Sequence, residues 1–120
     1  MNDQAIEQEI QAKGKTAPRV TPADIEANID SEHYFTAGQG IAGRCYREVS
    51  ALHSPGQLEL LTFCVLVLRN GTKVVGINHG AIDPAQHSAE RGRQKARTQA
   101  VDKLWELEGY VLHSKLAVQR

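Results

Sequence analysis

The chain has 120 residues, of which 41% are hydrophobic and 23% are charged, and its formal net charge is zero. A chain of this length forms one domain and is too short for a complete two-layer dinucleotide-binding domain. The composition is that of a soluble globular protein and excludes a disordered or fibrous one.

No segment has the features of a membrane anchor or a secretory signal. The longest apolar run, Leu60 to Leu68, is far shorter than the roughly 20 residues that a transmembrane helix needs. The amino terminus, MNDQAIEQEIQAKG, lacks a basic start followed by an apolar stretch. We therefore expect a cytoplasmic protein that does not contact membranes.

Charge is distributed unevenly along the chain. Residues 1–60 carry 9 acids and 5 bases, whereas residues 61–120 carry 5 acids and 9 bases. The excess positive charge of the second half indicates head-to-tail contact between copies or an anionic ligand, although unequal halves also occur without a functional reason.

Residues 1–19 are expected to form a flexible N-terminal arm, and residues 20–120 a single domain. Ile6 and Ile10 lie one helical turn apart in the arm, but Gly14 and Pro18 interrupt any longer helix.

A first helix is predicted near residues 22–30. Thr21 can accept a hydrogen bond from an unpaired amide, Pro22 suits the first helical position, and Asp24 favours the positive end of the helix. Ile25 and Ile29 would supply its buried face.

The next segment, SEHYFTAGQGIAG, is expected to be a glycine-rich connection. Its GQGIAG part, residues 38–43, has the spacing of the dinucleotide fingerprint G-x-G-x-x-G. A true fingerprint follows a buried strand and opens a helix, but SEHYFTA is too polar and too short for that strand. Glu59 could serve as the acidic residue further along, yet no second half-domain follows it. We therefore favour a conformationally demanding loop over a nucleotide site.

An antiparallel β-hairpin is predicted near residues 58–79, with Asn70-Gly71 as a two-residue turn. Counting outward from that turn gives two sets of facing residues, namely Leu68–Lys73, Leu66–Val75, Cys64–Ile77 and Thr62–His79 on one face, and Val67–Val74, Val65–Gly76 and Phe63–Asn78 on the other. Both faces of the first strand are apolar, so we expect a helix on one face and a second layer, from another subunit, on the other.

A long second helix is predicted near residues 84–108. Asp83 would cap it, Pro84 would occupy its first position, and Gly109 would follow its end. Its mostly small residues recur every three or four positions and allow close packing on the sheet; they are Ala89, Gly92, Ala96, Ala100 and Leu104, with Trp105 beside the last. The segment YVLHSKLAV is expected to continue as a short strand or helix.

Catalytic and metal-binding patterns are not recognisable. The histidines and cysteines lack the close spacing of zinc ligands, and no nucleophile has a catalytic partner within a known local motif. Cys64 lies in the most apolar strand, which argues against a disulfide with Cys45. We expect a protein that is not an enzyme and uses no metal or cofactor.

A binding site is predicted at the start of the long helix, which carries Arg91, Arg93, Lys95 and Arg97. These four cations are either a solvated face or a site for an anionic ligand or an acidic partner surface. Because the second strand ends just before this helix, Asn78 and His79 are expected to complete the site, together with Tyr34 and Phe35 from the aromatic segment.

Several segments together resemble a family of small tailed-phage and prophage proteins, labelled by gene products forty-nine and sixty-six of two enterobacterial podoviruses. The resemblance covers about residues 20–117 and is carried by SEHYFTA, LTFCVLVLRNG, VVG and GRQKARTQAVDKLWELEGYVL. It implies a phage accessory protein without an established activity, in which the glycine-rich segment is a variable loop. Where related chains tend to have a serine-bearing segment after VVG, this chain has INHG.

Two functions are compatible with this sequence. The first is an accessory protein of the host-interaction or anti-defence type, which captures a host factor or an anionic small molecule without catalysis. The second is a nucleic-acid-associated accessory protein that uses the basic helix, which the neutral overall charge makes less favourable. In both cases the expected fold is an α+β domain that assembles into a homo-oligomer based on a dimer.

Overall fold

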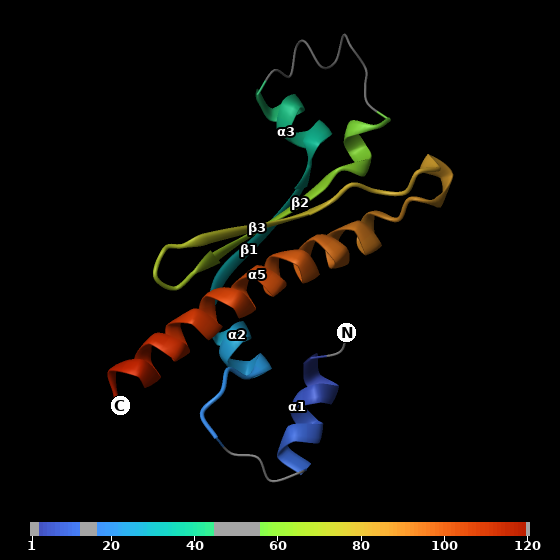
Figure 1. The fold of residues 1–120 in the computed structure, drawn as a ribbon. Helices are drawn as coiled ribbons and strands as arrows, with labels where there is room; N and C mark the ends of the chain where they lie inside the picture. The colour runs from blue at the N-terminus through green and yellow to red at the C-terminus, as the bar shows by residue number, and fades with distance from the viewer. Residues whose placement is uncertain (1–2, 13–16, 45–55, 120) are drawn as a thin grey trace.

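The computed structural model describes residues 3–12, 17–44 and 56–119 and shows a small α+β domain. Three strands form an antiparallel sheet in the order β1-β2-β3, and a long helix, α5, crosses one face of it (Figure 1). The helices are α1 (Asp3–Ala12), α2 (Pro22–Asn28), α3 (Ala37–Arg44) and α5 (Ala89–Val118), and the strands are β1 (Ile29–Thr36), β2 (Thr62–Leu68) and β3 (Lys73–Asn78). Single turns of 3-10 helix, η1 (Leu58–Leu60) and η2 (Pro84–Gln86), precede β2 and α5.

Helix α2 begins as predicted from the sequence. The hydroxyl of Thr21 accepts a hydrogen bond from the amide of Asp24 at 3.1 Å, and the carboxylate of Asp24 accepts one from the amide of Thr21 at 3.0 Å. This reciprocal capping box fixes the start of the helix. Ile25 is buried in the core, whereas Ile29 belongs to the strand that follows directly.

Residues 31–36 of the segment SEHYFTA form a strand, which corrects the expectation of a connection. They form most of β1, which pairs with β2 continuously from Ser31 to Thr36, with Tyr34 facing Cys64 and Phe35 facing Phe63. Polarity does not exclude this strand because β1 lies at the edge of the sheet, where half of its side chains reach solvent.

The GQGIAG segment is also not a loop, because it lies inside helix α3. Thr36 and Gln39 form a capping box at its start: the amide of Gln39 donates to the Thr36 hydroxyl at 3.1 Å, and the amide of Thr36 donates to the Gln39 side chain at 2.9 Å. The three glycines are therefore helical residues, and the spacing is unrelated to the phosphate-binding turn of a dinucleotide fingerprint.

The register of the hairpin differs by one residue from the prediction. The amide of Gly71 donates to the carbonyl of Leu68, and the amide of Leu68 donates to the carbonyl of Thr72, so the loop has three residues, 69–71, rather than two. Gly71 has a φ of +89°, as expected where a type I turn is followed by a left-handed residue. The facing pairs are Thr62–Asn78, Phe63–Ile77, Cys64–Gly76, Val65–Val75, Leu66–Val74 and Val67–Lys73.

The corrected register places the small residues of β3 and α5 against each other. Gly76 faces α5, and a Cβ atom there would overlap the carbonyl oxygen of Ala96 and lie 2.6 Å from the amide nitrogen of Ala100. The predicted stripe of α5 is buried at Gly92, Ala96, Ala100 and Leu104, whereas Ala89 is exposed. The core consists of this stripe and the alternate residues Cys64, Leu66 and Leu68 of β2 with Ile25, Val74 and Val101.

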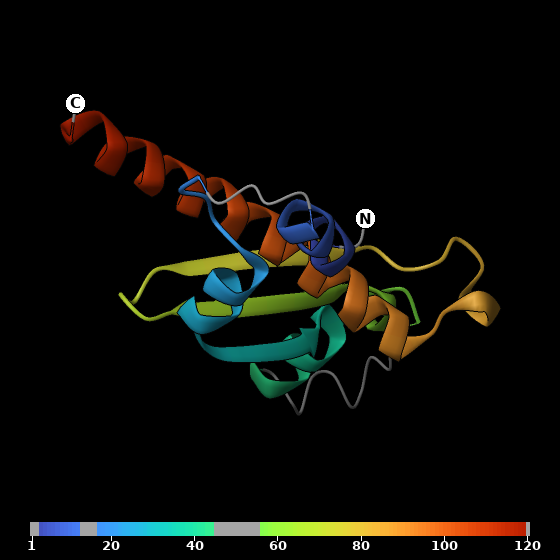
Figure 2. The same ribbon diagram turned by 90° about the horizontal axis from the view of Figure 1, so that it is seen from below.

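Helix α5 begins later and ends later than predicted. Asp83 caps only the turn η2, and Ser88 caps α5, its hydroxyl accepting a hydrogen bond from the amide of Arg91 at 3.2 Å. The helix continues through Gly109 to Val118, because a glycine costs only about 1 kcal/mol within a helix and ends one only when a left-handed turn follows. Its C-terminal part projects beyond the sheet (Figure 2). No helix among the described residues combines the length and apolarity that a membrane span requires.

The face of the sheet opposite α5 is only partly covered by described residues. Phe35 and Phe63 stack there with ring centroids 5.1 Å apart, and α3 approaches the Phe35 ring at Gly40. The alternate residues Val65, Val67, Val75 and Ile77 on this face are half-buried.

Candidate anion-binding site

The predicted site residues fall into separate groups on the molecule. Arg91, Lys95 and Asn78 line one pocket, at the start of α5. Arg97 lies near α2, and Arg93 and His79 are exposed and do not line that pocket. Tyr34 and Phe35 lie on opposite faces of the sheet, because successive residues of a strand alternate.

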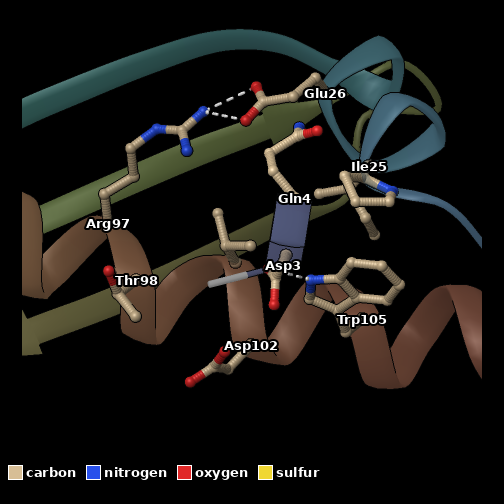
Figure 3. A pocket seen from close by; sticks show the side chains of 10 residues that line it. Asp3, Gln4, Ile25, Glu26, Arg97, Thr98, Asp102 and Trp105 are labelled. Atoms are coloured by element: carbon tan, nitrogen blue, oxygen red, sulfur yellow. Dashed lines mark hydrogen bonds and ion pairs between the residues drawn. The ribbon is translucent and has the colours of Figure 1, made fainter. Parts of the chain in front are cut away.

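Arg97 is occupied by two carboxylates. Its guanidinium donates to both oxygens of Glu26 on α2, at 2.8 and 3.0 Å (Figure 3). It also donates to Glu32 on β1 at 3.3 Å. Burial opposes the charged form, but these two carboxylates outweigh it and raise the pKa of Arg97 above its usual value. Arg97 therefore joins α5 to α2 and β1, and its charge is already compensated.

Tyr34 belongs to the same network. Its hydroxyl donates to Glu32 at 2.7 Å, and its ring packs against the core on the α5 side of the sheet. Burial and the hydrogen bond to Glu32 both raise the pKa of Tyr34, so the phenol stays neutral. The hydrogen bonds from Tyr34 and Arg97 in turn lower the pKa of Glu32.

A hollow of about 610 Å³ lies beside this network, between α1, α2 and α5 (Figure 3). Its charged lining residues are Asp3, Glu26, Arg97 and Asp102. Three carboxylates surround one paired arginine, so an anionic ligand is disfavoured here.

The pocket at the start of α5, which we call the Gly92 pocket, has a volume of about 220 Å³. The end of β3 and the segment that leads into α5 position its walls. The lining residues are Asn78, Gly80, Ala81, Gln86, His87, Ser88, Arg91, Gly92 and Lys95.

Gly92 leaves space for polar groups from three other elements. A Cβ atom at Gly92 would lie 3.0 Å from the hydroxyl of Thr62, 3.5 Å from the amide nitrogen of Asn78 and 3.5 Å from Cε1 of His87. Thr62 is only 3% exposed, and its hydroxyl has no hydrogen-bond partner among the residues that the structure describes. A buried hydroxyl without a partner is unusual and favours a ligand or a water molecule at this position.

The electrostatics of the Gly92 pocket favour an anion. Neither Arg91 nor Lys95 forms an ion pair with another residue in the described part of the chain, in contrast to Arg97. The pocket also lies at the amino-terminal end of a 30-residue helix, where the unpaired backbone amides carry partial positive charge.

Sequence reasoning missed lining residues of this pocket, among them Gly92 and His87, and it missed Thr62, which lies next to Gly92 without lining the pocket. Thr62 and Gly92 were recognised only as strand and packing residues, because their approach depends on the hairpin register. His87 occupies the position expected of His79, since the chain makes the turn η2 before the helix begins. The Ser88 cap was the signal in the sequence that could have located this helix start.

The described residues contain no group of three or more histidine, cysteine, aspartate or glutamate side chains that could hold a metal ion. Cys64 is a free thiol, and burial raises its pKa. Cys45 and His53 lie outside the described residues. That Cys45 forms no disulfide with Cys64 therefore stays a prediction.

A family model described as the phage protein (N4 Gp49/phage Sf6 gene 66) family matches residues 20–116. The chain belongs to this family. The sequence-based identification is therefore confirmed, and the matched residues include the sheet, the Gly92 pocket and most of α5, but not α1. No curated protein and no solved structure matches the chain significantly.

Proposed function

We propose that this member of the N4 Gp49/phage Sf6 gene 66 family is a phage accessory protein that captures an anionic small molecule in the Gly92 pocket without catalysis. The observation that carries the proposal is that Arg91, Lys95 and the Asn78 amide line one pocket at Gly92, with the buried Thr62 hydroxyl next to that glycine.

The chemistry of these groups matches a phosphoryl group. Phosphoryl oxygens accept hydrogen bonds and carry negative charge, whereas arginine, lysine and the asparagine amide supply donors, and a threonine hydroxyl can supply one. The positive end of α5 adds to this preference.

The size of the pocket limits what enters it. Its volume of about 220 Å³ is below the roughly 300–1,000 Å³ of pockets that enclose a drug-sized ligand. We therefore expect a phosphoryl group to occupy the pocket while the rest of the ligand lies over the exposed start of α5. Sequestration of a host nucleotide would suit a protein of the host-interaction or anti-defence type.

The proposal can be tested by thermal unfolding of the full chain with phosphate, pyrophosphate and a set of mono- and cyclic nucleotides, at constant ionic strength. A ligand that binds the folded state raises the melting temperature as its concentration exceeds its dissociation constant. We expect such a rise for at least one phosphoryl compound, and its loss in Arg91→Ala and Lys95→Ala.

Arg93→Ala is the matched control, because it removes the same charge from the same helix but does not line the pocket. The rise should persist in this variant. If no phosphoryl compound changes the melting temperature of the parent chain, small-anion capture is wrong.

Nucleic-acid binding is the second candidate, favoured by the three cations Arg91, Arg93 and Lys95 near the start of α5, none of which forms an ion pair with a described residue. Fluorescence anisotropy with labelled DNA and RNA across a salt series tests it, because contacts to phosphates give a steep salt dependence. Equal loss of affinity in all three alanine variants would support nucleic-acid binding over a single pocket.

A further inference from the structure

The C-terminal part of α5 has an exposed apolar face that continues the face buried by the sheet. Leu104 is fully buried, and beyond it Leu107, Val111 and Val118 are 44%, 48% and 84% exposed. Positions 104, 107, 111, 114 and 118 are separated alternately by three and four residues, which places them in one line along the helix. We call four residues of this line, Leu107, Val111, Ser114 and Val118, the projecting stripe.

The alternating spacing of three and four residues is typical of helices that pack side by side. The sheet of the same chain cannot cover the stripe, because this part of α5 projects beyond the sheet (Figures 1 and 2). The stripe extends over about 16 Å of helix. Tyr110, 75% exposed, flanks it and adds apolar area.

The charges beside the stripe indicate what covers it. Glu108 and Lys115 lie on the same flank, two turns apart, and on the opposite flank the residues are Tyr110 and Ala117. The ammonium group of Lys115 has no acidic partner in the described part of the chain, and only one oxygen of Glu108 is engaged, by the amide of Asn28 at 2.6 Å.

We infer that the projecting stripe is the site of self-association, in which α5 helices from two copies pack antiparallel about a two-fold axis. The axis passes between positions 111 and 114, so that Val111 of one copy contacts Ser114 of the other, and Leu107 contacts Val118. Glu108 then lies opposite Lys115 of the partner subunit, and the symmetry repeats this pair.

A parallel arrangement is excluded by the fold. The sheet covers the same side of α5 as far as Leu104, so two parallel helices would bring both sheets into the same space. In the antiparallel arrangement the sheets lie at opposite ends.

Charge reversal provides the test, with the mass of the full chain measured by light scattering coupled to gel filtration. Because a small interface gives weak association, the protein concentration that is applied to the column should range from about 10 µM to about 200 µM. The parent chain is expected to approach twice 13.2 kDa at the higher concentration. Glu108→Lys and Lys115→Glu should each be monomeric, and the double variant should recover the dimer.

Two further variants separate dissociation from misfolding. Asn28→Ala removes the hydrogen bond to Glu108 but leaves the charge of Glu108 unchanged, so this variant should stay dimeric. Val118→Glu changes a residue that is 84% exposed and cannot disturb the core, yet it should dissociate the dimer. Three results would each overturn the inference: a parent chain that is monomeric at every concentration, a double variant that stays monomeric, or single variants that remain dimeric. The last result would place the contact elsewhere, such as on the open face of the sheet.

Discussion

At the scale of single residues, the structure separates four cations that look equivalent in the sequence. Arg91 and Lys95 line the Gly92 pocket, Arg93 is exposed, and Arg97 is bound by Glu26 and Glu32. Helical spacing predicts which cations share a flank of α5, but it does not show which flank meets an acidic neighbour. That depends on where α2 and β1 lie, and residues 26 and 32 are distant from 97 in the chain.

The network around Glu32 predicts a dependence of stability on pH. Hydrogen bonds from Tyr34 and Arg97 lower the pKa of Glu32 below its usual 4.5 in the folded state. A carboxylate with a lowered folded pKa stabilises the fold above its unfolded pKa, and this contribution is lost as the pH falls through the folded value. The parent chain should therefore lose stability below about pH 4.5.

Glu32→Gln tests this contribution by thermal unfolding between pH 7 and pH 3. The variant should be less stable than the parent at pH 7, by about 1 kcal/mol or less because the network is partly solvated. The difference should shrink as the pH falls through the folded pKa of Glu32, which lies below 4.5, because the parent carboxylate then becomes protonated. A difference that is independent of pH would show that Glu32 acts only through its shape and hydrogen bonds.

At the scale of elements, the packing of α5 on β3 depends on a close approach at Gly76. Gly76→Ala should destabilise the fold by about 3 kcal/mol or more, because its Cβ atom would overlap backbone atoms of α5 that cannot move independently. Urea unfolding gives the free energy of unfolding. Gly43→Ala is the control, since it lies in helix α3 with no atom within 4 Å of the added methyl group, and it should be neutral or slightly stabilising.

Some of the elements could be predicted from the sequence and others could not. The capping pattern at Thr21 and the small-residue stripe predicted α2 and the α5–sheet contact, because both depend on local spacing. Strand β1 was missed because an edge strand needs only one apolar face, and α3 because three glycines conceal the Thr36–Gln39 capping box.

The hairpin register was missed for a different reason. Asn70-Gly71 fits both a two-residue turn and the end of a three-residue turn, and the choice moves every residue of β3 to the other face. The proximity of Thr62 and Asn78 to Gly92 depends on this register. For the candidate site, the sequence therefore predicted Arg91, Lys95 and Asn78 but not the groups beneath them.

At the scale of the whole molecule, α5 and α2 lie side by side on one face of the sheet, and α1 packs on their outer side (Figure 2). Helix α1 lies outside the residues matched by the family, yet it is held against the domain. Trp105 donates its indole N–H to Asp3 at 3.0 Å, and Arg19 forms an ion pair with Glu7. Ile6 and Ile10 lie with Trp105 around a hollow of about 350 Å³.

This arrangement predicts that α1 covers part of the domain without being required for its fold. Among the residues that the structure describes, no member of the buried core precedes Ile25, so a chain of residues 20–120 should unfold cooperatively, with a lower melting temperature than the full chain. Trp105 is the only tryptophan, and it should become more exposed, shifting its fluorescence emission to longer wavelength.

Asp3→Ala in the full chain is the matched control for that truncation. It removes the hydrogen bond to the indole but leaves the apolar residues of α1 in place, so its emission should change much less than that of the shortened chain. A shortened chain with no cooperative transition would show that α1 belongs to the folding unit. Unchanged emission on truncation would show that α1 does not cover Trp105 in solution, and the arm would then be flexible, as the breaks at Gly14 and Pro18 predict.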